Sequence, residues 1–274
     1  MEKSGREALE AMKPLIVGPL TEQNEFELLY HLKKFSESEK CQYIKAADRI
    51  LIFNIIDKYL HNPQIISCCA SVLNYKIRGK LSEMVENITI EIICKSISNI
   101  CRVHNRDSKI VRLMASNLAR LTVHYSISRC LLKYGFMKCL PIMMRTALRS
   151  NLDPICIIEC GRIFNNVIMH SVLTRDTFST SDMECLELMI TGMESCDDYD
   201  IFEDGIEIIL NIMERKETFC YCAEKLMLMD KRLMRMILSK LVEFPEKSDH
   251  FVGVYAALIE QSGLVAPGVL RSRV

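Results

Sequence analysis

The chain has 274 residues, 49% hydrophobic and 26% charged, which is enough apolar material to bury a long core. Its 35 Lys and Arg equal its 35 Asp and Glu, so composition argues against a protein that is basic throughout. No apolar run approaches the ~18 residues of a membrane span, and the first residues lack the apolar segment of a secretory signal. We therefore expect a soluble protein of the cytoplasm or nucleus, a reducing compartment in which most of the 13 cysteines pack as small apolar residues.

Residues 1–35 are predicted to form an N-terminal helical cap. A short helix is expected around Arg6–Met12, followed by a break at Pro14 and at Gly18-Pro19. A second, amphipathic helix is expected from about Thr21 to Lys34. The residues predicted to face inward on it are Phe26, Leu29, Tyr30 and Lys33. Ser36–Glu39 has capping-box spacing and is predicted to open the next helix.

Three later segments share one design. Each begins with a capping residue, which is Asn62, Asp107 or Asp153. A small residue then occupies the same place in each, 45 and 46 residues apart: Ala70, Ala115 and Gly161. In the middle segment, residues 107–124, the buried stripe is predicted to be Ile110, Met114, Leu118 and Leu121. A period of this length is typical of a stacked helical array.

Residues 128–144 contain a short helix that ends at Gly135, where a left-handed conformation is expected, and a second helix that follows at once. Further on, Ser181–Glu184 is a capping-box candidate, and 200–213 is a predicted helix with Gly205 near the small position. The last predicted helices are Phe219–Leu228, Leu233–Val242 and Ser248–Ile259.

A short helix, a glycine, a second helix and a long capped third helix together resemble the armadillo repeat. The resemblance implies an all-α, right-handed superhelix of about five repeats over residues 36–262. Their approximate bounds are 36–79, 80–127, 128–173, 174–216 and 217–262. Residues 263–274 have no helical periodicity and are expected to form a flexible tail.

The resemblance also implies that the third helices line a concave groove. The exposed stripe on 107–124 is predicted from helical spacing, and shifts by 46 and then 45 residues give the equivalent positions downstream. The groove residues predicted in this way are Lys109, Arg112, Ser116, Arg120, Arg162, Asn166, Glu207 and Asn211. Ile155, Ile158, His124 and His170 fall on the same rows, although half-exposed histidines at helix ends are the simpler expectation.

Asn166 and Asn211 stand where armadillo proteins often place an asparagine that binds the backbone of an extended peptide. Importin-like members pair this asparagine with a tryptophan, and the chain has none. Recognition of a conventional nuclear localisation signal is therefore not expected, whereas another extended or helical segment still fits such a groove.

Charge is unevenly distributed along the chain. Residues 101–150 hold ten Lys and Arg against one acid, Asp107, and residues 182–217 hold twelve acids against Arg215 and Lys216. In a helical array this order predicts a bipolar groove that orients an oppositely charged partner. The alternatives are solvated faces without a binding role, head-to-tail self-association, and nucleic-acid binding along 101–150.

The sequence contains few motifs typical of a catalytic, metal or cofactor site. No paired C-x₂-C and H-x₃₋₅-H spacing predicts zinc, and no nucleophile elbow or Gly-rich phosphate loop predicts an enzyme or a cofactor. The terminal Ser272-Arg273-Val274 fits the form of a PDZ-domain ligand.

The leading hypothesis is a non-enzymatic scaffold for a protein partner. In it, Arg112, Arg120 and Arg162 bind an acidic part of the segment and Glu207 binds a basic part, while the two asparagines bind its backbone. Nucleic-acid binding is the alternative, and neither hypothesis involves a membrane.

Overall fold

The structure is a computed structural model that describes residues 2–37, 46–76, 87–150, 154–171, 180–213 and 223–247, with single positions at 249, 252, 253 and 256. Every regular element within these ranges is helical, so the predicted all-α class is confirmed. The chain divides into two compact units, Met1–His170 and Ser171–Val274. Among the described helices, none combines the length and apolar character needed to cross a bilayer.

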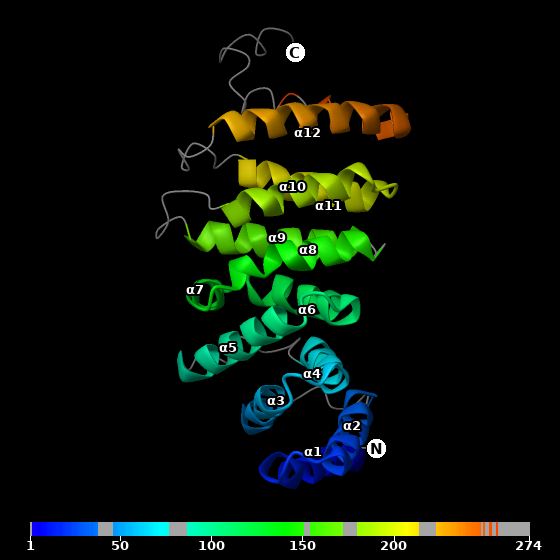
Figure 1. Cartoon of the computed structure of the whole chain (residues 1–274). Helices are drawn as coiled ribbons and strands as arrows, with labels where there is room; N and C mark the ends of the chain where they lie inside the picture. Colours follow the sequence, from blue (N-terminus) through cyan, green and yellow to red (C-terminus); the bar gives the residue numbers. More distant parts are fainter. Residues whose placement is uncertain are drawn as a thin grey trace. The chain divides into compact units, whose positions relative to one another are not determined.

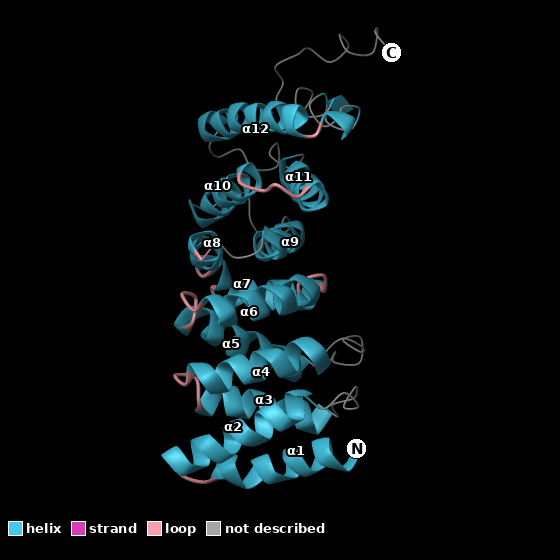
Figure 2. Cartoon of the chain, turned by 90° about the vertical axis from the view of Figure 1, so that its right-hand side faces the viewer, coloured by secondary structure: helices cyan, strands magenta, loops and turns pink. Residues whose placement is uncertain are grey.

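In the first unit, successive helices pack in two rows (Figures 1 and 2). Helices α2, α4 and α6 pack one on the next, and so do α1, α3, α5 and α7. The elements are α1 Glu2–Val17, α2 Glu22–Glu37, α3 Ala46–Lys58, α4 Pro63–Lys76, α5 Asn87–Val103, α6 Ser108–Leu121, α7 Tyr125–Lys133, the 3-10 turn η2 Phe136–Lys138, α8 Leu140–Arg149 and α9 Pro154–Ser171. Each row buries an apolar stripe of its helices against the other row.

Polar side chains tie the end of one helix to the end of an earlier helix. Lys58, at the end of α3, donates to the carbonyls of Leu15 (3.3 Å), Ile16 (2.6 Å) and Gly18 at the end of α1. The ring of His104, after α5, lies 2.6 Å from the carbonyl oxygen of Leu60, after α3. The last carbonyls of a helix have no partner within it, so these contacts satisfy acceptors that would otherwise need water.

The caps and small positions predicted from the sequence are confirmed where the structure describes them. The Asn62 side chain accepts from the backbone N–H groups of Gln64 and Ile65 at 3.1 and 3.2 Å, and the Asp107 carboxylate accepts from the N–H of Ile110 at 3.0 Å. Gly135 is left-handed, with a φ of 70°. The predicted stripe of α6 and the small residues are buried: Ile110, Met114, Leu118, Leu121, Ala70, Ala115 and Gly161.

The N-terminal predictions are wrong in three places. Pro14 lies inside α1, because the helix needs to continue for only one more turn and a proline there removes a single hydrogen bond. Ser36 is in the last turn of α2, where its hydroxyl donates to the Lys33 carbonyl, so it does not open a new helix. On α2, Phe26 is 70% exposed and Tyr30 57% exposed, whereas the buried face is Leu28, Leu32 and Phe35.

The second unit contains α10 Thr180–Glu194, α11 Tyr199–Met213, α12 Ala223–Glu243 and the 3-10 turn η4 Pro245–Lys247. Helix α10 packs against both α11 and α12. The helix predicted at 200–213 is confirmed as α11, but Ser181 lies within α10 and not before it. The break predicted between Leu228 and Leu233 is also wrong, because α12 continues through it.

Polar contacts between helices recur in this unit, one of them buried and the other exposed. Lys240 of α12 is only 3% exposed and donates to the carbonyl of Cys196, just after α10. Arg232, also on α12, donates from Nε to Glu194 at 2.7 Å and to the Thr191 hydroxyl at 2.9 Å. Both contacts join the end of α10 to α12. The predicted cap at Asp153, the tail 263–274 with its possible PDZ ligand, and most of the predicted helix 248–259 lie outside the described residues.

Candidate functional site: a basic surface

Helix α6 presents three of the predicted groove residues to solvent. Lys109, Arg112 and Arg120 are exposed, and Ser116 is half-buried between them. The helix holds this stripe outward because Ile110, Met114 and Leu118 bury the opposite side. The α6 part of the predicted surface is therefore accessible to a ligand.

Helix α9 reproduces this stripe only in part. Arg162 is exposed and lies 3.6 Å from the Glu159 carboxylate one turn earlier. Ile158, which the 46-residue shift places on the exposed row, is only 3% exposed, so that part of the prediction is wrong. The exposed face does not recur because α9 is buried over a wider arc than α6, with Cys156, Ile157 and Ile158 consecutive in the core.

The side chain of Asn166 forms hydrogen bonds with other residues of the protein. Its amide donates to the Thr122 hydroxyl at 3.2 Å and to the Ala119 carbonyl at 3.4 Å, both at the end of α6. Asn117, buried on α6, makes the equivalent contact to the Ala70 carbonyl of α4 at 3.0 Å. The asparagine that we expected to bind a partner's backbone thus joins α9 to the end of α6.

The two histidines on the same rows also belong to helix ends. His170 is half-buried, and its Nε2 lies 3.2 Å from the Val123 carbonyl oxygen. Its ring meets that of Tyr125 edge-on, with centroids 5.5 Å apart. His124 is exposed and occupies the N-cap of α7 without a side-chain capping bond.

Glu207 and Asn211 are exposed on α11, in the second unit. The groove residues of α6 and α9 belong to the first unit, so the structure brings the predicted set together only within each unit.

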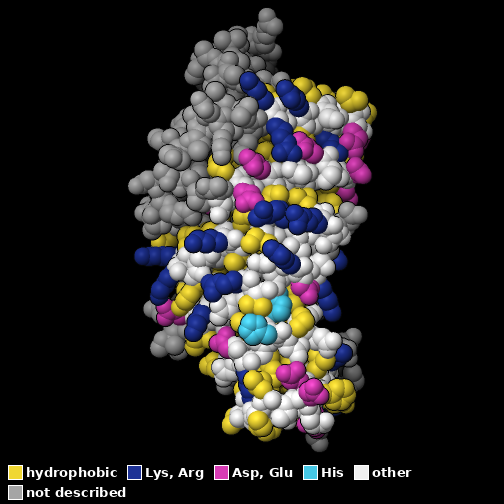
Figure 3. Space-filling view, in the orientation of Figure 1, with side chains coloured by type: hydrophobic (Ala, Val, Ile, Leu, Met, Phe, Trp, Pro, Cys, Tyr) yellow, Lys and Arg dark blue, Asp and Glu magenta, His cyan; other side chains and the backbone are white. Residues whose placement is uncertain are grey.

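The basic stretch 101–150 is largely exposed. Nine of its ten Lys and Arg are exposed and Arg145 is half-buried, while the single acid, Asp107, is used as the cap of α6. Lys133 binds Glu91 of α5, which lowers the pKa of the Glu91 carboxyl by hydrogen bonding and by charge, so this cation is neutralised. Figure 3 shows the Lys and Arg side chains spread over α5 to α8.

We call six of these cations the basic surface, because they lie on α6, on α8, which packs against α6, and in the turn before α6. They are Arg106, Lys109, Arg112, Arg120, Arg145 and Arg149. No acidic residue other than the capping Asp107 occurs in these described elements. These elements therefore carry a net positive charge although the whole chain is neutral.

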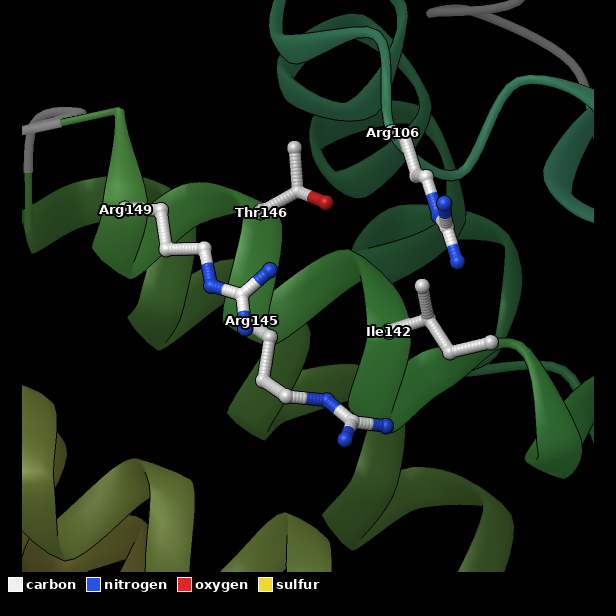
Figure 4. A pocket seen from close by; sticks show the side chains of 5 residues that line it. All are labelled: Arg106, Ile142, Arg145, Thr146 and Arg149. Carbon is white, nitrogen blue, oxygen red and sulfur yellow. The ribbon is translucent and has the colours of Figure 1, made fainter.

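Three arginines of the basic surface surround a cavity of about 210 Å³, which we call the arginine pocket (Figure 4). On α8, Ile142, Arg145, Thr146 and Arg149 have i, i+3, i+4, i+7 spacing and so share one face. Arg106 faces them from the turn between α5 and α6. None of the described residues that line the pocket is acidic.

Thr146 fixes this arrangement. Its hydroxyl donates to the carbonyl of Asn105 at 2.7 Å and thereby holds the α5–α6 turn against α8. Asn105 precedes Arg106, so the bond sets the position of the Arg106 backbone relative to Arg145 and Arg149. The pocket is built from two segments about 40 residues apart whose approach depends on a defined contact.

Sequence reasoning counted these three arginines in the basic stretch but did not place them at a site. The available signal was local: Arg145 and Arg149 are one turn apart, with a hydroxyl beside them on the same face. The contribution of Arg106 depends on how α8 packs and could not be read from spacing.

Within the described ranges, no group of three or more His, Cys, Asp or Glu side chains is arranged to hold a metal ion. Comparison with protein-family models, curated proteins and solved structures finds no match to this chain. The basic surface is thus the feature on which a functional proposal can be built.

Proposed function

We propose that the protein is a non-enzymatic interaction scaffold that binds an acidic, extended or helical segment of a partner protein on its basic surface. The observation that supports this most directly is the exposure of Lys109, Arg112 and Arg120 on α6 and of Arg149 on α8, while Asp107, the acid that precedes α6, is used as its helix cap. A surface that gathers charges of one sign attracts a partner of the opposite charge.

We further propose that the helices form an armadillo-like right-handed superhelix. Support comes from the two rows of helices in the first unit and from the side-chain bonds that recur at separations of 41 to 47 residues, such as Thr146 to Asn105 and Asn117 to Ala70. In this proposal α6 and α9 line the partner-binding side, and Arg162 extends the basic surface toward α9.

Capture of partners from a lysate of the producing cells tests the function. The informative variant carries Lys109→Glu, Arg112→Glu and Arg120→Glu, all at exposed positions of α6. The matched control reverses three exposed cations elsewhere in the first unit, Arg6, Lys33 and Lys95. Circular dichroism should first show that both variants keep the helical content of the wild type.

The expected result is a protein partner that the wild type and the control retain, that the α6 variant loses, and that nuclease does not release. Equal capture by all three proteins would contradict the proposal. Loss of every bound component on nuclease treatment would instead favour nucleic-acid binding along 101–150.

A further inference from the structure

We propose that the arginine pocket binds a phosphate monoester, carried as a phosphoserine or phosphothreonine on the partner segment. This inference rests on the proposed function and names the group that the basic surface recognises. It depends on two observations: the number of guanidinium groups around one cavity, and the contact that holds its two sides together.

The chemistry of the lining suits a doubly charged group. Arg106, Arg145 and Arg149 each present a planar fork of N–H donors, and such forks match phosphate oxygens in pairs. A phosphate monoester has about −1.5 to −2 charges near pH 7 and three acceptor oxygens, whereas a carboxylate has one charge and two oxygens. Three guanidinium groups can therefore form more charge-assisted hydrogen bonds with a phosphorylated side chain than with Asp or Glu.

The size and shape of the cavity agree with this ligand. Its volume of about 210 Å³ is several times the ~30 Å³ that one water molecule occupies in the liquid, so a phosphate group fits together with some hydration. Ile142 and Thr146 form the part of the lining between the arginines (Figure 4). The Thr146 hydroxyl already donates to Asn105, which leaves the guanidinium groups as the principal ligand-binding donors.

A nucleic-acid backbone fits the pocket less well. Each phosphodiester carries a single charge, and non-specific binding of a strand uses a row of cations with aromatic side chains that stack on bases. The pocket is one discrete cavity, and the described residues that line it include no aromatic side chain. A single dianionic group is the ligand that this geometry favours.

Titration of the arginine side chains by NMR tests the inference. The full chain, labelled with ¹⁵N-arginine, would be titrated with three probes: the blocked peptides Ala-phosphoserine-Ala and Ala-Glu-Ala, and a dinucleotide with one phosphodiester. The Nε–Hε signals of Arg106, Arg145 and Arg149 should shift with the phosphopeptide, with a Kd at least tenfold lower than for either other probe. Signals of Arg6, on α1, and Arg235, on α12, which lie outside the basic surface, are the internal control.

A variant with Arg106→Lys, Arg145→Lys and Arg149→Lys keeps the charge but loses the paired donors, and should bind the phosphopeptide at least fivefold more weakly. Equal affinity for the Glu peptide would overturn the phosphate inference and leave the acidic-segment proposal standing. No shift at the pocket arginines with either peptide would overturn the inference and remove this pocket from the partner-binding surface. Tighter binding of the dinucleotide would overturn it in favour of nucleic acid.

Discussion

Gly205 of α11 lies against Met193 of α10. A Cβ atom at this position would lie 2.0 Å from the sulfur of Met193 and 3.0 Å from its Cγ, and Met193 is fully buried. The repeat period placed Gly205 near the small position of its helix, 44 residues after Gly161, and the structure identifies Met193 as the neighbour that requires a small residue.

Gly205→Ala should lower the free energy of unfolding by up to about 2 kcal/mol, because overpacking of the core, at about 1–3 kcal/mol, outweighs the ~1 kcal/mol that alanine gains over glycine in a helix. Urea denaturation followed by circular dichroism measures the change. Gly253 is the matched control, since it is helical and a Cβ there would meet nothing within 4 Å. Gly253→Ala should be neutral or stabilising, so equal losses in both variants would contradict the packing explanation.

Buried thiols make the free energy of unfolding depend on pH. Burial raises the pKa of the Cys69, Cys94 and Cys101 thiols above the ordinary value, with a smaller contribution from a neighbouring cysteine in each case. In the unfolded chain these groups ionise near their usual pKa of about 8.5. Above this pH the unfolded state therefore releases protons that the folded state keeps.

The free energy of unfolding should fall as pH rises from about 8 to 9.5, with a slope that approaches about 1.4 kcal/mol per pH unit for each such thiol. Urea unfolding at a series of pH values, in the presence of a reductant, measures this slope. Cys101→Ala removes one of the three groups and should make the slope shallower, whatever its effect on stability at pH 7. A slope that stays the same in this variant would count against buried-thiol titration.

At the scale of the helix, the contacts of Lys58 replace hydrogen bonds that α1 cannot make itself. Lys58→Met should lower the free energy of unfolding by about 1.5–3 kcal/mol, because the terminal carbonyls of α1 lose a charged donor. Amide hydrogen exchange should also become faster at the end of α1. Lys33→Met, on the exposed side of α2, is the control and should change stability by less than about 0.5 kcal/mol.

Local signals in the sequence located several elements correctly. The caps at Asn62 and Asp107 and the turn at Gly135 depend on bonds within a few residues, so their residue types and spacing were sufficient. The Pro14 and Ser36 predictions used the same kind of signal and failed, because packing of α1 and α2 against each other maintains both helices through those positions.

The buried face of α2 and the arginine pocket depend on tertiary contacts. Helix α2 has two overlapping apolar stripes, and only its contacts with α1 and α4 decide that Leu28 and Leu32 are buried while Phe26 and Tyr30 are exposed. The arginine pocket likewise needs α8 to lie beside the α5–α6 turn. Periodicity within one helix contains neither piece of information.

At the scale of the whole molecule, the net charge of zero is the sum of opposite net charges on the two units. Met1–His170 contains 24 Lys and Arg against 16 Asp and Glu, a net charge of +8. Ser171–Val274 contains 11 against 19, a net charge of −8. Each unit should therefore attract ligands of the opposite sign, and a steering effect on an acidic partner belongs to the first unit rather than to the chain as a whole.

Association with an acidic partner segment should accordingly slow as salt is added, because the Debye length shortens from about 30 Å at 0.01 M to about 8 Å at 0.15 M. Stopped-flow fluorescence with a labelled Glu-rich peptide should show an association rate constant at least fivefold lower at 0.15 M than at 0.01 M NaCl, with a smaller change in dissociation. The Lys109→Glu, Arg112→Glu and Arg120→Glu variant should lose most of this dependence, whereas the Arg6, Lys33 and Lys95 reversal should retain it.

Sedimentation at both salt concentrations separates steering from head-to-tail self-association, which would raise the mass of the free protein at low salt. An equally steep salt dependence in both variants would mean that the cations of α6 do not guide the encounter.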